Sequence, residues 1–168
     1  KNIMDVNFND EIIYETKNFI VCIPKMSHIP RKDGGHIWIR AKKNKFCSRL
    51  DLNPKEATEV MRLTMLISEA MINGMKNRNI SIEKINYQEN GNWAYRKGKN
   101  PVFHIHLYGR TINSKTQTFG EALVFPNKDT GFYDKFESFN FDDIREIKKQ
   151  ISVLENTEKY NPKNWNLK

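Results

Sequence analysis

The segment formed by residues 101–110 constrains the fold of this chain more than any other part of the sequence. It reads Pro-Val-Phe-His-Ile-His-Leu-Tyr-Gly-Arg, with an apolar residue at every second position. Successive side chains of a strand point to opposite faces of a sheet. We therefore expect a strand over residues 102–108, with Phe103, Ile105 and Leu107 in the core. The other face then carries two imidazoles, His104 and His106, about 7 Å apart.

The rest of the chain alternates between short strand patterns and two amphipathic helix patterns. The sequence Asn53-Pro54-Lys55-Glu56 is a strong helix start, because Asn caps, Pro suits the first turn and Glu56 reaches back to the capping amide. This helix is expected to end at Gly74. A second helix is predicted over residues 141–154, with isoleucines and a leucine on one stripe. Residues rich in β-branched and aromatic side chains predict further strands, which lie at 11–14, 19–23, 36–40, 82–88 and, more briefly, 122–125.

These elements predict an α+β fold, an antiparallel sheet of about five strands with two main helices. Residues 90–100 are expected to form a loop punctuated by glycines. The domain organisation expected is one domain over residues 1–115 and a C-terminal extension over residues 116–168. The extension contains the second helix and a polar tail from Glu155 onward, which we expect to be loosely held.

Composition excludes several classes of protein. The chain has 168 residues, of which 38% are hydrophobic and 29% charged, as in a folded globular domain. No apolar stretch is long enough to predict a membrane span. Cys22 and Cys47 form no CxxC pair, so neither a disulfide framework nor a zinc ribbon is indicated. A reducing, cytoplasmic setting is therefore expected.

The net charge of +8 is unevenly distributed. Residues 25–49 carry eight basic side chains and one acidic side chain, and residues 92–118 carry five basic side chains and no acidic one. Two basic segments in an otherwise slightly acidic chain indicate a site for phosphate groups, either free or in a nucleic acid. A solvated, lysine-rich surface explains the same pattern.

The two strand histidines admit more than one kind of chemistry. Histidine acts as a nucleophile or as an acid and base near neutral pH. A His-x-His pair also supplies two ligands of a metal ion, and zinc would then require a third ligand. His28, His36 and Asp33 are candidates for that ligand, and no spacing singles one out. His28 is otherwise expected to be a surface loop residue.

Residues 102–110 resemble the signature strand of the histidine triad family, in which three alternating histidines precede an arginine. Aligning on Gly109-Arg110 places the central, nucleophilic histidine at His104 and the third at His106. Val102 then stands where the first histidine is usual. The alternative register, with His106 central, brings Gly109-Arg110 two residues too early.

Other segments extend the resemblance to roughly residues 10–112. Residues 34–43 (Gly-Gly-His-Ile-Trp-Ile-Arg-Ala-Lys-Lys) are similar to the Gly-His strand of the family, with Ala41 in place of the usual proline. The capped helix start follows at a similar distance. Asn90 lies 14 residues before His104, where family members carry an Asn or Gln that helps to bind the substrate.

The resemblance implies a nucleotide hydrolase or nucleotidyl transferase. His104 would attack the α-phosphate of a dinucleoside polyphosphate, phosphoramidate or similar nucleotide ester, and form a nucleotidyl-histidine that water hydrolyses. His106 would contact phosphate or assist the leaving group. The residues expected to contact substrate are His36, Asn90, Lys99 and Asn100. No metal or cofactor is implied, and a homodimer through the region of the first helix and its neighbouring strand is expected.

Two alternative functions remain open from the sequence. One is a non-catalytic module that binds a nucleotide or RNA through the basic segments. The other is a metal-dependent hydrolase that uses His104 and His106.

Overall fold

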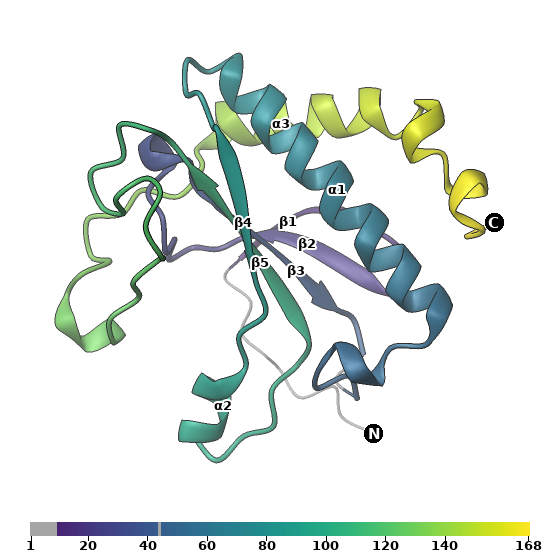
Figure 1. Ribbon diagram of the computed structural model, residues 1–168, viewed down its shortest axis with the longest axis horizontal. Helices are drawn as coiled ribbons and strands as arrows, with labels where there is room; N and C mark the ends of the chain where they lie inside the picture. Colours follow the sequence, from purple (N-terminus) through teal and green to yellow (C-terminus); the bar gives the residue numbers. More distant parts are fainter. Residues whose placement is uncertain (1–9, 44) are drawn as a thin grey trace.

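The computed structural model, which describes residues 10–43 and 45–168, contains one antiparallel sheet of five strands (Figure 1). Every neighbouring pair of strands is antiparallel. In spatial order the strands are β1 (Glu11–Glu15), β2 (Phe19–Ile23), β3 (His36–Ala41), β5 (His104–Arg110) and β4 (Lys84–Gln88). This confirms the α+β class and the predicted sheet. The histidine strand begins two residues later than predicted, and it lies between β3 and β4.

The two predicted helices are present as α1 (Pro54–Lys76) and α3 (Phe141–Leu154). At the start of α1, the Glu56 amide donates to the Asn53 side chain and the Asn53 amide donates to the Glu56 carboxylate, both at 3.0 Å. The helix runs past Gly74, where we expected it to end. A Cβ atom at Gly74 would lie 3.0 Å from the backbone nitrogen of Ile147 in α3. This glycine therefore allows the two helices to approach closely and does not terminate α1.

The core lies between the sheet and these helices. Figure 1 shows α1 lying across the strands, and α1 packs against α3. Ile37 and Ile39 of β3 and Ile105 and Leu107 of β5 are among the buried residues of this core. The alternation predicted for the histidine strand is therefore confirmed: its apolar side chains pack inward, and its histidines lie on the opposite face.

Two further local predictions were wrong. The expected loop at residues 90–100 contains a short helix, α2 (Asn92–Arg96). Residues 122–125 do not form a strand, because a side chain takes the place of a partner strand. The Gln117 side chain accepts a hydrogen bond from the Val124 amide at 2.9 Å and donates one to the Val124 carbonyl at 2.8 Å.

The C-terminal tail is also more firmly held than expected. Tyr160 is only 1% exposed and belongs to the core. Arg62 of α1 donates to the Tyr160 carbonyl at 2.7 Å, and the Tyr160 hydroxyl donates to Glu69 at 2.6 Å. The composition of the tail is polar, but this one aromatic ring anchors it to α1.

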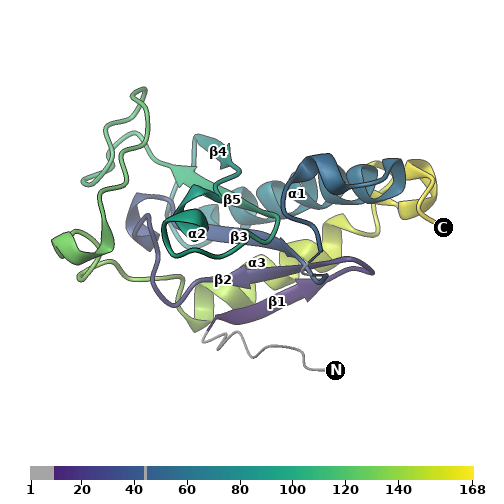
Figure 2. The ribbon, with the colours of Figure 1, turned by 90° about the horizontal axis from the view of Figure 1, so that it is seen from below.

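The long connection between β5 and α3 lies at the end of the molecule away from the C-terminus (Figure 2). Within the described ranges, no helix combines the length and the hydrophobicity that crossing a bilayer requires.

The close approach of Gly109 to Gly34 gives a stability prediction. A Cβ atom at Gly109 would lie 2.6 Å from the carbonyl carbon of Gly34, and because this neighbour is backbone, one of the two segments must shift to accept it. We expect Gly109→Ala to lower the free energy of unfolding by about 3 kcal/mol, as overpacking does. Chemical denaturation followed by circular dichroism measures this change.

Gly120→Ala is the control, because a Cβ atom there meets nothing within 4 Å. Only the positive φ of 88° opposes that substitution, at a cost of about 1 kcal/mol. Equal losses in the two variants would contradict the steric explanation.

Candidate functional site

The register between β3 and β5 gathers the polar side chains of both strands on the face of the sheet opposite the core. Arg40 lies opposite His104, and His36 lies opposite Tyr108. Between these pairs, Trp38 lies opposite His106. Because positions 36, 38 and 40 share one parity and positions 104, 106 and 108 share another, one antiparallel pairing places all six side chains together.

His104 is held in a single tautomer by its own strand. Its Nδ1 lies 2.7 Å from the carbonyl oxygen of Val102. A carbonyl oxygen can only accept, so Nδ1 carries the proton and Nε2 of the neutral ring keeps its lone pair. Burial lowers the pKa of His104, and the nearby charge of Arg40 lowers it further, against the opposing effect of the Val102 hydrogen bond. The ring is therefore neutral near neutral pH and presents a nucleophilic nitrogen.

A chain of hydrogen bonds that starts at the His28 amide determines which ring nitrogen of His106 carries the proton. The backbone amide of His28 donates to Nδ1 of His36 at 3.2 Å, which leaves the proton of the neutral His36 ring on Nε2. That Nε2 lies 2.8 Å from Nδ1 of His106 and donates to it. His106 therefore carries its own proton on Nε2. His104 offers a lone pair and His106 offers an N–H donor, with 4.7 Å between the two ring centroids.

These rings remain uncharged because they are buried. Burial is the main cause that moves the pKa of His36 and of His106 well below 6.5, and other imidazoles nearby lower both further. His28 follows the same pattern, and its pKa falls to about 4. The charge of Lys128 contributes to all three shifts. At neutral pH all of these histidines act as neutral donors and acceptors.

His28 is not the surface loop residue that we expected. Its ring stacks on His36 with a centroid distance of 4.8 Å and an interplanar angle of 26°. Its Nδ1 lies 2.9 Å from the hydroxyl of Tyr108. The loop between β2 and β3 folds back over the sheet and so brings this residue to the histidine pair of β5. No spacing in the sequence predicts that this loop brings His28 to the histidines of β5.

A cavity of about 550 Å³ opens beside the two strand histidines. All six residues predicted to form the site line it: His36, Asn90, Lys99, Asn100, His104 and His106. Asn90 and Lys99 reach it from the segment between β4 and β5, at the two sides of α2. His36 is only 2% exposed, and its Nε2 contacts Nδ1 of His106.

Sequence reasoning missed several residues that line the same cavity. Arg40 shares the parity of His36 on β3, so the strand alternation could have identified it. Trp93 comes from α2, and its ring lies 5.9 Å from the Lys128 ammonium. Phe125 and Lys128 come from the long connection between β5 and α3. Their presence depends on how residues 111–140 fold back, which no local pattern encodes.

His28, His36 and His106 also bring three possible metal-ligand nitrogens within 4.8 Å of one another. Two features of their geometry oppose a metal centre. The rings of His28 and His36 are nearly parallel, and lone pairs that lie in nearly parallel, stacked planes do not converge on one ion. In addition, the amide of His28 keeps the proton of His36 on the nitrogen that would ligate. These residues form a hydrogen-bonded relay that runs from the His28 amide through His36 to His106, here termed the histidine relay. This geometry does not fit a zinc site.

Asp33, the other candidate ligand from the sequence, is committed elsewhere. One of its carboxylate oxygens accepts four hydrogen bonds from the backbone and hydroxyl groups of residues 114–116, at 2.8–3.0 Å. The residue fastens the segment after β5 and does not line the cavity.

The basic side chains of residues 25–49 do not form one surface. Arg31 pairs with Asp143, Arg49 pairs with Glu89, and Lys42 pairs with Glu15. In the second basic segment, Arg110 is buried and donates to Asn86 and to the backbone carbonyls of Thr118 and Glu121. Four of the thirteen basic side chains in these two segments are therefore engaged in contacts within the protein.

No family model and no curated protein matches the sequence. Among solved structures, a histidine triad protein from Bradyrhizobium japonicum is similar, with a TM-score of 0.59 and 12% identity over 86% of this chain and 90% of that one. A hypothetical histidine triad nucleotide-binding protein from Sulfolobus tokodaii has a TM-score of 0.56 and 16% identity over 90% of both chains.

A zinc-bound histidine triad family protein from Mycobacterium smegmatis has a TM-score of 0.54 and 18% identity, over 88% of this chain and 87% of that one. At identities of 12–18%, the likeness to these three structures is one of three-dimensional structure. This chain has the fold of the histidine triad proteins.

Proposed function

We propose that this protein is a nucleotide hydrolase or nucleotidyl transferase that uses His104 as its nucleophile. The observation that carries the proposal is the 2.7 Å contact between Nδ1 of His104 and the Val102 carbonyl. It leaves the lone pair of Nε2 on a ring that lines a cavity of nucleotide-binding size. The fold supports the same function, since one protein of similar structure is described as nucleotide-binding.

In the first step, Nε2 of His104 attacks the α-phosphorus of the nucleotide and the bond from phosphorus to the leaving group breaks. The product is a nucleotidyl-histidine whose ring is cationic. Its Nδ1 keeps the proton and still donates a hydrogen bond to the Val102 carbonyl. A covalent intermediate divides one difficult displacement into two easier ones. The substitution of the first triad histidine by Val102 leaves this contact in place, because the backbone supplies the acceptor.

His106 and the cations of the cavity serve the leaving group. The Nε2–H of His106 donates a hydrogen bond to the departing atom, and a phosphate leaving group departs as an anion. Arg40, Lys99 and Lys128 line the cavity, and Asp10 is the one acidic residue among the described lining residues. An excess of positive charge favours a substrate with phosphate on both sides of the broken bond. This supports a dinucleoside polyphosphate over a phosphoramidate.

In the second step, water attacks the phosphorus, loses one proton to solvent, and the P–N bond breaks, which releases the nucleoside monophosphate and restores neutral His104 with its lone pair on Nε2. A hydroxyl or amine acceptor in place of water makes the reaction a transfer. The relay from the His28 amide through His36 remains unchanged throughout, because none of its protons has to leave.

We place the enzyme in a reducing cytoplasm because Cys22 and Cys47 are both free.

We also propose a homodimer that pairs α1 and β4 of one protomer with those of its partner. Strand β4 is an edge of the five-stranded sheet, so the backbone groups on its outer side lack a strand partner. Tyr87 of β4 and Met61 of α1 are each more than half exposed. Apolar side chains beside an open strand edge are suited to an isologous contact.

The nucleotidyl-histidine is the direct test of the proposed function. Wild-type protein mixed with a dinucleoside polyphosphate and quenched in alkali is expected to gain the mass of one nucleotidyl group on His104. His104→Gly is expected to lose the adduct and to lower kcat by a factor of 10³ or more, in line with loss of a covalent nucleophile. Mass spectrometry of peptides from the quenched protein locates the adduct.

The same experiment in excess chelator separates this mechanism from a metal-dependent one, because the adduct is expected to form at an unchanged rate. Nucleotide binding by His104→Gly, measured by calorimetry, separates it from a non-catalytic module. An adduct on His106 would contradict the chosen register, and nucleotide binding without any adduct would leave only a binding module.

The pH dependence of kcat/KM follows from the neutral state of His104. Protonation of Nε2 removes the nucleophile, and burial moves the pKa of His104 below its ordinary value of 6.5. Activity is therefore expected to be constant above pH 6.5 and to fall as the pH drops through this lowered pKa. Initial rates over pH 4.5–8 measure the acidic limb of this profile, the pH window being set by about one to two units on either side of the ordinary pKa.

Arg40→Met provides the matched comparison. The Arg40 charge lowers the pKa of His104, so its removal is expected to move the acidic limb toward higher pH. A limb at the same pH in both proteins, or one above pH 6.5 in the wild type, would contradict the assignment of His104 as the titrating group.

Light scattering after size-exclusion chromatography tests the dimer, with an expected mass of twice the 19.9 kDa of one chain. Tyr87→Glu is expected to give the mass of one chain, because like charges would face each other across the two-fold axis. Phe141→Glu is the control, since Phe141 is 77% exposed on α3, away from the proposed contact. A monomeric wild type at micromolar concentration would disprove the dimer.

A further inference from the structure

The loop between β2 and β3 supplies the first hydrogen bond of the histidine relay, so whatever holds this loop also holds the relay. The donor is the backbone amide of His28, 3.2 Å from Nδ1 of His36. The amide must stay in place for His36 to keep its proton on Nε2 and donate to His106. A displaced loop would free Nδ1 of His36 to carry the proton, and His106 would then lose its donor.

The loop is held from outside by the segment at the start of α3. The backbone amide of Arg31 donates to the Glu137 carbonyl at 2.8 Å. The Ser138 hydroxyl donates to the Pro24 carbonyl at 2.5 Å and lies 3.2 Å from the Lys25 carbonyl. Residues 137–143, here termed the brace, therefore contact the loop at its beginning and at its middle.

The third contact of the brace closes the end of the loop. Gly35, immediately before His36, adopts a φ of 76° and lies directly against the ring of Phe139. A Cβ atom at Gly35 would overlap that ring, so the loop and the brace fit together at this point without free space. Phe139 is 5% exposed and belongs to the core.

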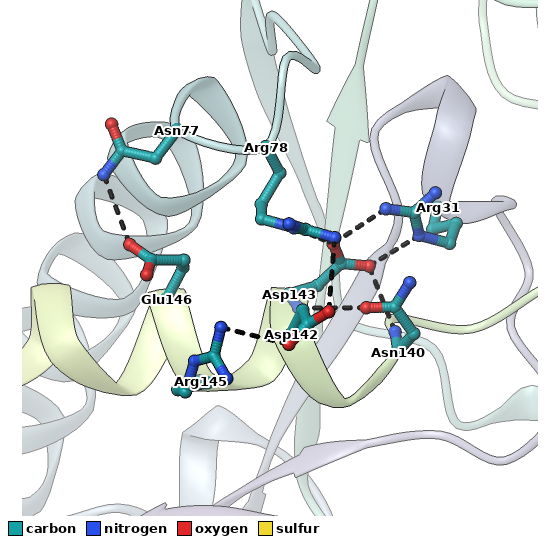
Figure 3. Close-up of polar contacts among 8 residues, drawn as sticks. All are labelled: Arg31, Asn77, Arg78, Asn140, Asp142, Asp143, Arg145 and Glu146. Atoms are coloured by element: carbon teal, nitrogen blue, oxygen red, sulfur yellow. Dashed lines mark hydrogen bonds and ion pairs between the residues drawn. The ribbon is translucent and has the colours of Figure 1, made fainter.

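Asp143 is the charged centre of the brace (Figure 3). Its two carboxylate oxygens accept from Nε and from one terminal nitrogen of Arg31, at 2.5 and 2.7 Å. Figure 3 shows Arg78 approaching the same carboxylate from the end of α1, at 3.1 Å. The carboxylate also accepts from the Asn140 amide at 3.0 Å, as part of the capping box of α3.

The side chain of Asp143 is fully buried, while that of Arg31 is 13% exposed. A buried, hydrogen-bonded ion pair of this kind is costly to break, because removal of one partner leaves the charge of the other without compensation. Two-pronged Arg–carboxylate pairs also fix orientation as well as distance. Arg31 is three residues from His28 in the same loop, so only a short backbone segment connects the ion pair to the His28 amide.

We propose that Asp143 is a positioning residue which, through Arg31, keeps the His28 amide on His36 and thereby keeps the His106 proton on Nε2. This inference rests on the proposed function only for its effect on rate. Its effect on the histidine protons stands without any activity. It also gives the extension a role in the chemistry, because the extension supplies the brace.

Long-range ¹H–¹⁵N correlation spectra of the histidine rings test the proposal directly. In the wild type, His36 and His106 are expected to show an unprotonated Nδ1 and a protonated Nε2. In Asp143→Asn, both are expected to move toward a mixture of tautomers. His104 is the internal reference and is expected to stay protonated on Nδ1, because its partner Val102 lies in its own polypeptide segment.

The rate is expected to change in parallel. Misplacement of a donor near the reacting atoms reduces kcat by about 10-fold to 100-fold, and KM is expected to change much less because the cavity walls remain. Glu69→Gln is the matched control. It removes one carboxylate from a different ion pair of the extension, with Lys159 at 2.6 Å, and is expected to keep wild-type spectra and rates.

Ser138→Ala provides a second variant of the brace that leaves every charge in place. If Asp143→Asn does not fold, Ser138→Ala tests the proposal in its place. The expected result is a smaller shift of the His36 signals in the same direction. Unchanged His36 and His106 tautomers in each folded brace variant would overturn the proposal. A wild type without an adduct but with tautomers that respond to Asp143→Asn would disprove the proposed function and support the brace. The reverse result would disprove the brace alone.

Discussion

The structure of this site depends on a simple asymmetry of the peptide group: a backbone amide can only donate and a backbone carbonyl can only accept. The Val102 carbonyl determines the tautomer of His104, and the His28 amide determines that of His36 and, through it, that of His106. One backbone acceptor and one backbone donor thus make two neighbouring imidazoles complementary. Both groups are suited to an attack on phosphorus, in which the lone pair forms the new bond and the donor stabilises the developing negative charge.

This arrangement also explains how several histidines can be buried together. Charged imidazoles at these ring separations would repel one another and would lose hydration, so burial favours the neutral forms. Neutral rings need hydrogen-bond partners for their buried nitrogens, and the chain from the His28 amide to His106 supplies them for both nitrogens of His36 and for Nδ1 of His106. The same chain occupies the nitrogen that a metal ion would need, so the relay and a metal site exclude each other.

The substitution at position 102 has a smaller consequence than the sequence suggests. A strand histidine at this position would contribute its side chain, whereas the contact with His104 is made by the carbonyl of residue 102. Every residue type has a backbone carbonyl, so any residue in the backbone conformation of Val102 provides that acceptor. Val102 also lines the cavity, where it adds an apolar wall beside His104.

Local patterns were sufficient for most of the secondary structure. The capping box of α1, the stripe of α3 and the alternation around His104 depend on residues close in sequence, and all three were predicted. The failures share a different cause. The side chain of Gln117 takes the place of a partner strand for Val124. Gly74, which was expected to end α1, instead allows α1 and α3 to approach closely. Both effects depend on a neighbour that local patterns do not identify.

By itself, the sequence determined the sheet, its two helices, the apolar face of β5 and the two imidazoles on the opposite face, because periodicity is a property of neighbouring residues. It also identified six residues that line one cavity. Only the tertiary structure decided that His28 joins the site, that residues 125 and 128 close it, and that Asp143 holds the loop. Those contacts join segments separated by 8 to more than 100 residues, and their formation depends on the packing of the whole chain rather than on any local pattern.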